Sequence, residues 1–182
     1  MVLLESKNIK KGTSMPSFNL YDTNGILKSL SQLKGLKGTV IIFTCNHCPY
    51  AKAIWGRLIK LHHKFQDHGI EFVAINPNIN PDYPEDNPEK MKQLHDSFNL
   101  PFSYLIDTDQ SVAKQYQAVC TPDIYLLNHD NSLIYHGALD NNWQNENLVT
   151  TQYLCDAITS LINKKTIEFL YPTSMGCSIK WV

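Results

Sequence analysis

Two cysteines separated by two residues stand where an apolar run gives way to a proline. The segment reads Thr44-Cys45-Asn46-His47-Cys48-Pro49, and residues 39–44 are mainly apolar or β-branched. Such a run is typical of a strand buried on both faces, and proline is well tolerated in the first turn of a helix. We therefore predict that Cys45 and Cys48 form a redox-active dithiol where a buried strand passes into a helix.

Hydrophobic periodicity extends this strand and helix into an α/β domain. Apolar residues recur at helical spacing from Ala51 to Phe65, Gly69 ends the helix, and residues 70–75 form a second apolar run, which makes a β-α-β unit. The remaining pattern predicts a hairpin over 18–33, a helix over 88–98, a strand over 102–106, a short helix over 109–117, a hairpin over 123–135 and a last helix over 154–162. This order predicts an α/β fold with a mixed central sheet flanked by helices, an N-terminal β-hairpin and a C-terminal tail.

The chain length favours one domain. With 182 residues and 43% hydrophobic composition, the chain can bury a single sizeable core. We expect one domain over 1–182, divided into an N-terminal extension (1–38), a core (39–163) and a tail (164–182).

Charge and cysteine usage restrict the partners and the compartment. The formal net charge is −1, which gives no electrostatic footprint for nucleic acid or for an anionic membrane. The first eight residues hold too few apolar side chains for a secretory signal, so we expect a cytoplasmic protein with no membrane partner. Five cysteines is an odd number, and in a reducing compartment we expect thiols that are free, buried, catalytic or metal-bound.

The position of the cysteine pair at a helix N-terminus predicts its reactivity. Unpaired N–H groups and the positive end of the helix dipole stabilise a thiolate, so the pKa of Cys45 should fall below about 8.5. We expect Cys45, nearer the loop, to be the nucleophile and Cys48 to resolve the mixed disulfide. His47 would stabilise the Cys45 thiolate and make the couple more oxidising; the alternative is a solvent-exposed loop histidine without a role.

A zinc site is the main structural alternative for the pair. Structural zinc takes four ligands, usually from two paired motifs. The other cysteines, Cys120, Cys155 and Cys177, are scattered singly, and no second half-site is visible. We therefore expect no metal and no cofactor.

Two motifs, residues 45–49 and Val119-Cys120-Thr121-Pro122-Asp123, resemble the thioredoxin superfamily. The chain looks closest to its redoxin branch, the peroxiredoxin-like proteins related to alkyl hydroperoxide reductase and thiol-specific antioxidant. Segments 18–37, 72–76 with 83–86, and 174–181 are similar to the same branch. The resemblance implies a thioredoxin-like fold in which Pro122 is cis and packs opposite the cysteine pair. The backbone of Thr121 would then lie where a substrate strand or mixed disulfide pairs.

Two departures from the peroxiredoxin pattern favour disulfide exchange over peroxide reduction. Peroxiredoxins arrange Pro-x-x-x-Thr-x-x-Cys around the reactive cysteine, and neither Cys45 nor Cys48 has this context. They also use an arginine from a distant strand, whereas Arg57, the only arginine here, lies on the cysteine-bearing helix, about 13 Å from Cys48 by helical rise.

Several further residues are candidates around the pair. Asp123 either replaces the buried acid that thioredoxins place before the first cysteine or faces solvent at a strand start. Cys120 is either a third redox thiol or a small packed side chain, and Cys177 either relays oxidation or anchors the tail. The loop 76–87 should begin beside the cysteines, because the carboxyl ends of parallel strands share one edge of a sheet.

The sequence as a whole predicts an enzyme. We expect a thiol–disulfide oxidoreductase in cell redox homeostasis, acting on protein or low-molecular-weight disulfides and served by an unidentified reductant. The alternatives are a thiol-dependent peroxidase and a non-catalytic protein that binds a metal or a partner through Cys45 and Cys48.

Overall fold

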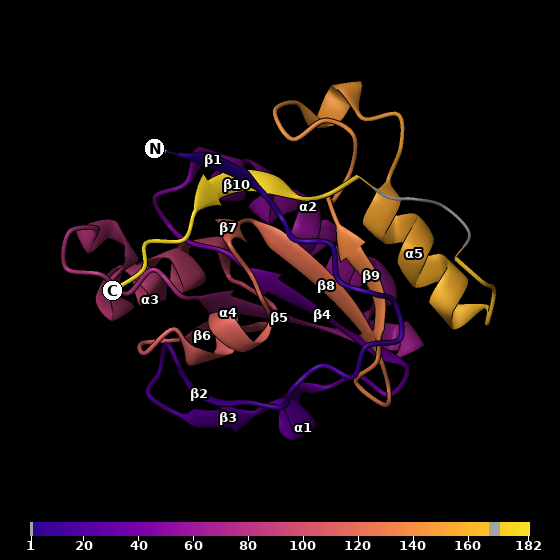
Figure 1. Ribbon diagram of the computed structural model, residues 1–182, viewed down its shortest axis with the longest axis horizontal. Helices are drawn as coiled ribbons and strands as arrows, with labels where there is room; N and C mark the ends of the chain where they lie inside the picture. The colour runs from indigo at the N-terminus through magenta and orange to yellow at the C-terminus, as the bar shows by residue number, and fades with distance from the viewer. Residues whose placement is uncertain (1, 168–171) are drawn as a thin grey trace.

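A seven-stranded mixed sheet forms the centre of the computed structural model, which describes residues 2–167 and 172–182 (Figure 1). Parts of the predicted extension and tail, residue 1 and residues 168–171, lie outside the described residues. The strand order is β3-β2-β6-β5-β4-β8-β9, with β4, β5 and β6 parallel and the other neighbours antiparallel. The bounds are β2 Asn19–Asp22, β3 Leu27–Ser29, β4 Gly38–Phe43, β5 Ile70–Asn76, β6 Ser103–Ile106, β8 Asp123–Asn128 and β9 Leu133–Gly137. The predicted mixed sheet and N-terminal hairpin are confirmed.

Helices cover both faces of this sheet. α2 (Pro49–Phe65), α3 (Pro88–Phe98) and α5 (Tyr153–Ile162) contribute to one core with Val40 and Ile42. α1 (Leu30–Leu33) and α4 (Ser111–Gln115) contribute to the core on the other face with Ile41 and Phe43. Successive side chains of a strand point to opposite faces, so the side chains of β4 enter both cores, and all six of its residues are buried.

The helix that follows the cysteines begins and ends as its sequence predicts. Cys48 is the N-cap of α2 and Pro49 occupies the first helical position. A short 3-10 helix, η1 (Gln66–His68), closes it, and Gly69 follows with φ +80°, a conformation that favours glycine. Two further 3-10 helices, η2 (Pro84–Asp86) and η3 (Glu146–Leu148), lie in loops.

A second, three-stranded sheet was not predicted. β1 (Leu3–Glu5), β10 (Met175–Ser178) and β7 (Cys120–Thr121) pair antiparallel in the order β1-β10-β7, so segments near both termini meet (Figure 1). These strands have two to four residues, too few for an alternating pattern to be recognised in the sequence. The described part of the predicted tail therefore contains a strand, β10, that pairs with β1 and β7.

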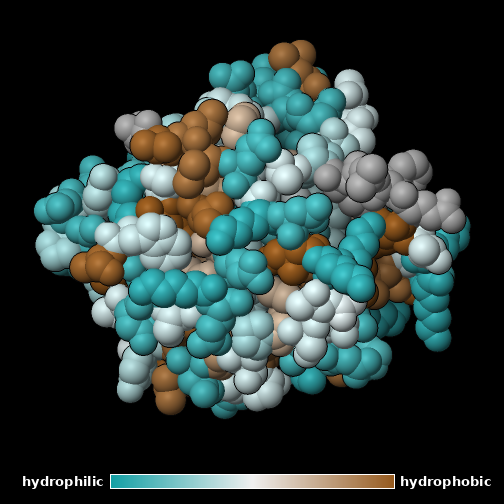
Figure 2. All heavy atoms as spheres, in the orientation of Figure 1, coloured by the Kyte–Doolittle hydropathy of each residue, from teal (hydrophilic) through white to brown (hydrophobic). Residues whose placement is uncertain are grey.

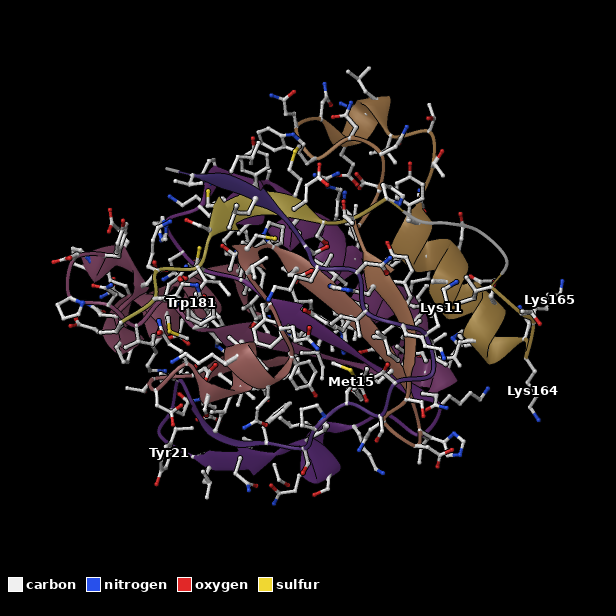
Figure 3. The ribbon with its side chains drawn as sticks, viewed as in Figure 1. Lys11, Met15, Tyr21, Lys164, Lys165 and Trp181 are labelled. Carbon is white, nitrogen blue, oxygen red and sulfur yellow. The ribbon has the colours of Figure 1, made fainter. Side chains whose placement is uncertain are left out.

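Some apolar side chains remain exposed on the surface of the molecule. Apolar side chains gather in Figure 2 over the region where β1 and β10 lie in Figure 1, and Leu3 and Met175 are exposed there. Figure 3 shows Tyr21 on the outer hairpin and Met15 inside the molecule, in agreement with their 57% and 5% exposure. Within the described residues, no helix has the length and apolarity that crossing a bilayer requires.

We expect Ile42→Ala to lower the free energy of unfolding by about 2–5 kcal/mol, because it leaves a cavity in the centre of β4, where Ile42 is fully buried. Urea unfolding followed by circular dichroism measures the change. Leu36→Ala is the matched control, since Leu36 is 90% exposed and should give almost no change. Equal effects of the two substitutions would contradict the described core.

Candidate functional site

The two cysteines lie in the connection between β4 and α2, below the protein surface. The Thr44 N–H donates to the Ile75 carbonyl at 2.9 Å, which extends the β4–β5 pairing up to Cys45. Cys45 and Cys48 each have 0% exposure, and they form a small apolar cluster with Ala51 and Cys177. The pair thus occupies the predicted position, but as a closed site rather than an exposed one.

The segment before Pro122 lies directly against both sulfurs. The Thr121–Pro122 peptide is cis, as the resemblance implies. Cys45 Sγ lies 3.1 Å from Thr121 Oγ1, and Cys48 Sγ lies 3.2 Å from the Thr121 carbonyl oxygen. The expected juxtaposition of residues 121 and 122 with the cysteine pair is therefore present.

The pKa values of the two cysteines depart in opposite directions, and not as predicted. Burial, a hydrogen bond with Cys48 and the charge of Asp86 hold the pKa of Cys45 well above its usual range. The hydrogen bond from Cys45 lowers the pKa of Cys48 to about 5, with help from Cys177 and the Ala51 N–H and against the effect of burial. The expected low pKa at Cys45 is wrong, because Cys45 is fully buried, and because the helix begins only after Cys48, so that the N–H groups of its first turn lie next to Cys48.

Asp86, from the loop 76–87, fixes the backbone between the cysteines. This carboxylate has 0% exposure and accepts from the Asn46 N–H at 2.5 Å and from Asn76 Nδ2 at 3.2 Å. Asn46 in turn donates through Nδ2 to the Glu85 carbonyl at 2.8 Å. The loop therefore begins beside the pair, as predicted, and it acts as a clamp on the residues between the cysteines.

His47 also contacts Asp86. Its Nδ1 pairs with Asp86 Oδ2, and its ring lies 5.0 Å from that of Tyr83, centroid to centroid. The side chain is 9% exposed, so the alternative of a solvent-exposed histidine is wrong. Its Nε2 is buried and has no hydrogen-bond partner among the described residues. A role for His47 in stabilising a thiolate stays a prediction.

Asp123 is buried behind the cis-proline segment. It has 0% exposure, and its oxygens accept from Tyr125 Oη at 2.9 Å and pair with His136 Nε2 at 2.8 Å. The solvent-facing alternative is therefore wrong. Asp123 is thus a buried acid beside Pro122. That it replaces the buried acid of thioredoxins stays a prediction.

The remaining cysteines differ in their surroundings. Cys120 is fully buried, its Sγ lies 3.9 Å from the Pro122 carbonyl, and burial raises its pKa, which fits packing. Cys155 is 7% exposed on α5, and Lys64 Nζ donates to its sulfur at 3.2 Å. Cys177 is 2% exposed, and its Sγ lies 2.7 Å from Cys48 Sγ. Of these three, only Cys177 contacts the cysteine pair through its sulfur.

Arg57 is occupied away from the cysteines. Its guanidinium donates to Asp140 Oδ2 at 2.6 Å and to the carbonyls of Asn142 and Trp143 at 2.8 and 2.6 Å. It therefore holds the loop that follows β9, in line with its predicted position along the helix. Beside this loop, Ile54, Pro122 and Met175 contribute to the lining of a cavity of about 260 Å³.

One group of residues has the composition of a partial metal site. Cys45, His47 and Asp86 each bring a ligand atom within 4.8 Å of the others. Both oxygens of Asp86 already accept hydrogen bonds or pair with His47, so hydrogen bonding accounts for the cluster. Structural zinc would also need a fourth ligand.

Sequence reasoning missed three polar residues of the site. The sequence predicted both Asp86 and Asn76 only as residues of the loop 76–87, with no role in the site. Tyr104, whose hydroxyl donates to Asn46 Oδ1 at 2.9 Å, reads as an ordinary core residue. The carboxyl-end rule for parallel strands could have identified Asn76, because β5 ends next to β4.

Fold and site together define a thioredoxin-fold protein with a buried dithiol. The family model of the AhpC/TSA family matches residues 11–136, so the chain belongs to that family. It is similar to the thiol-disulfide oxidoreductase ResA of Bacillus subtilis, 27% identical over 73% of this chain and 70% of the relative. It is also similar to a chloroplastic peroxiredoxin Q of Populus jackii, 28% identical over 59% of this chain and 47% of that protein.

Solved structures extend the similarity over the whole chain. A crystal structure of an uncharacterized conserved protein from Geobacillus kaustophilus has a TM-score of 0.94 and 38% identity, and the match covers 100% of this chain and 97% of that one. A hypothetical protein from Sinorhizobium meliloti has a TM-score of 0.92 and 32% identity, with 98% of each chain covered. The predicted redoxin membership and thioredoxin-like fold are confirmed.

We expect the reduced protein to show a thiolate whose absorbance rises with a midpoint near pH 5, and the transition to belong to Cys48. Ultraviolet absorbance against pH, with Cys48→Ser as the reference, measures it. Cys45→Ala should raise the midpoint, because it removes the donor that lowers the Cys48 pKa most, and Cys45→Ser, which keeps a donor, should raise it less. A transition that survives in Cys48→Ser would contradict the assignment.

We expect Asp86→Asn to lower the free energy of unfolding by about 1.5–3 kcal/mol, since hydrogen bonds to a charged acceptor are lost in a buried position. It should also lower the pKa of Cys45 by removing a nearby negative charge. The control is Glu85→Gln, because Glu85 is exposed and takes part through its backbone carbonyl. The clamp is refuted if both variants unfold at the same urea concentration.

Proposed function

We propose that this protein is a thiol–disulfide oxidoreductase of the redoxin type that acts on protein or low-molecular-weight disulfides. The observation that carries the proposal is the placement of Cys48, a thiol of lowered pKa at the N-cap of α2, against Cys45 and the cis-proline segment. A thiolate is the species that attacks a disulfide, and a second thiol nearby displaces the product.

The similarity to ResA supports this class of reaction. The name of that relative describes a thiol-disulfide oxidoreductase, and the match covers more than two thirds of both chains. We propose the same class for this chain, in cell redox homeostasis, with an external thiol or dithiol as the reductant.

The surrounding residues receive supporting roles in this proposal. The Thr121 carbonyl and hydroxyl position the two sulfurs, and Pro122 shapes the wall beside them. Asp86 holds His47, which lies between the cysteines in the sequence. Asp123 supports the proline segment from behind through Tyr125 and His136.

Peroxide reduction is the second candidate, and the peroxiredoxin Q relatives favour it. The arginine that would assist a peroxidatic thiolate is absent from the site, because Arg57 is held by Asp140 and two loop carbonyls. We therefore propose disulfide exchange as the main activity, and a purely metal-binding or partner-binding role as the weaker alternative.

A reducing compartment such as the cytoplasm is the proposed place of action. The odd number of cysteines does not fit a structural disulfide framework, and Cys120 and Cys155 are buried thiols. We propose no nucleic-acid or membrane partner, because the formal net charge is −1.

We expect the reduced protein to cleave an aromatic disulfide reagent and oxidised glutathione catalytically in the presence of dithiothreitol. Cys48→Ser should lower kcat/KM at least about 100-fold, which corresponds to ~2.7 kcal/mol of activation free energy. Cys155→Ser should keep the activity, since that thiol is on α5. Rapid peroxide consumption without disulfide turnover would instead establish the peroxidase, and a full rate in Cys48→Ser would refute both.

A further inference from the structure

The strand β10 occupies the edge that a substrate strand would need. Its residue Cys177 pairs antiparallel with Thr121, and Ser178 pairs with Cys120. This is the position where a mixed disulfide would pair in the fold that the resemblance implies. Here the chain fills the position with its own segment, and it places a cysteine there.

Gly176 permits this close approach. A Cβ at this position would lie 2.0 Å from the Thr121 carbonyl oxygen and 3.0 Å from the Pro122 nitrogen, distances that side chains do not tolerate. Only glycine therefore lets β10 lie against the cis-proline segment as closely as it does. Gly176 thus allows its neighbour Cys177 to lie close to Cys48.

Hydrogen bonds from the three residues that follow Cys177 fix this segment. The Ser178 N–H donates to the Val2 carbonyl at 2.8 Å and the Ile179 N–H to the Val119 carbonyl at 2.9 Å. The Lys180 N–H donates to Asn78 Oδ1 at 2.8 Å, which ties the segment to the loop that also carries Asp86. A sulfur held in this way meets Cys48 without a search through many conformations.

The sulfur of Cys177 faces Cys48. The two Sγ atoms lie 2.7 Å apart inside a cluster that includes Cys45, and Cys177 itself is 2% exposed. We propose that Cys177 is a catalytic residue that forms the resolving disulfide with Cys48, with β10 acting as a tethered substrate strand. This inference rests on the proposed function and names the internal partner of the reaction.

The chemistry balances with one substrate disulfide. The Cys48 thiolate attacks R–S–S–R′, the bond from Cys48 to the R sulfur forms, and R′S⁻ leaves. The Cys177 thiol gives up its proton to R′S⁻ and attacks Cys48, so the Cys48–Cys177 disulfide forms, and RS⁻ leaves and is protonated by solvent. The substrate gains two electrons, the two cysteines lose them, and an external dithiol later restores both thiols.

The groups around Cys177 keep it protonated until Cys48 has reacted. Burial and the neighbouring Cys48 sulfur raise the pKa of Cys177 to about 12, while the positive charge of Lys180 opposes the rise. Cys48 loses its negative charge when it enters a mixed disulfide, which removes one cause of the rise. Cys177 is thus held as a thiol at rest and becomes easier to deprotonate once Cys48 has reacted.

Mapping of disulfides tests the proposal without an activity assay. The reduced wild-type protein and Cys45→Ser are oxidised with glutathione disulfide, quenched by acid and alkylation, and analysed as non-reduced peptides by mass spectrometry. We expect Cys48–Cys177 to be the first intramolecular disulfide in the wild type and to form in Cys45→Ser as well. The proposal is overturned if Cys45–Cys48 forms first, or if Cys45→Ser keeps glutathione on Cys48.

A glycine pair provides the matched comparison. Gly176→Ala should push β10 away from β7 and slow Cys48–Cys177 formation at least about tenfold, whereas Gly56→Ala should not, since a Cβ at Gly56 meets nothing within 4 Å. Equal rates in the two variants would contradict the tethered strand. A wild type that forms Cys48–Cys177 but never turns over disulfides would refute the proposed function and leave this pairing intact.

Discussion

The buried carboxylate of Asp86 is the interaction on which the site depends. A charge without exposure is costly unless hydrogen bonds compensate it, and here the compensation comes from the Asn46 N–H, Asn76 and His47. The same contacts that satisfy the carboxylate therefore fix the two residues between the cysteines. The geometry of the dithiol follows from a loop far away in sequence rather than from the cysteine motif alone.

The charge of Asp86 also contributes to the difference between the pKa values of the two sulfurs, after burial and the hydrogen bond between them. It adds to the effect of burial at Cys45, whereas Cys48 receives hydrogen bonds from Cys45, Cys177 and the first turn of α2. One sulfur is thus kept protonated and donates to the other, so a single negative charge is stabilised within an otherwise apolar cluster. A buried pair of thiolates would be far less stable, because neither charge has solvent to reduce the repulsion.

The sequence predicted the central sheet well because periodicity records burial. The mainly apolar, β-branched run of β4, the apolar stripe of α2 and the helix Pro88–Phe98 could be recognised without any partner. The three-stranded sheet could not be recognised, because β7 and β10 are strands only through their pairing and are too short to show a hydrophobic pattern. The same limit applies to the site: the cysteine pair was evident, whereas the reversal of its pKa values required the position of Asp86 and the first residue of the helix.

The pairing of segments near both termini has a consequence for how the site is completed during folding. The Ser174 N–H bonds to Ser6 Oγ across 168 positions of the chain, and Cys48 meets Cys177 across 129. Contacts between residues so far apart carry a high entropic cost of loop closure and slow the steps that depend on them. The parallel strands β4 and β5, joined by one helix, have much more local contacts. A nascent chain that already holds its sheet would therefore present Cys45 and Cys48 uncovered until segment 175–178 arrives, and during that interval these thiols would be open to any oxidant nearby.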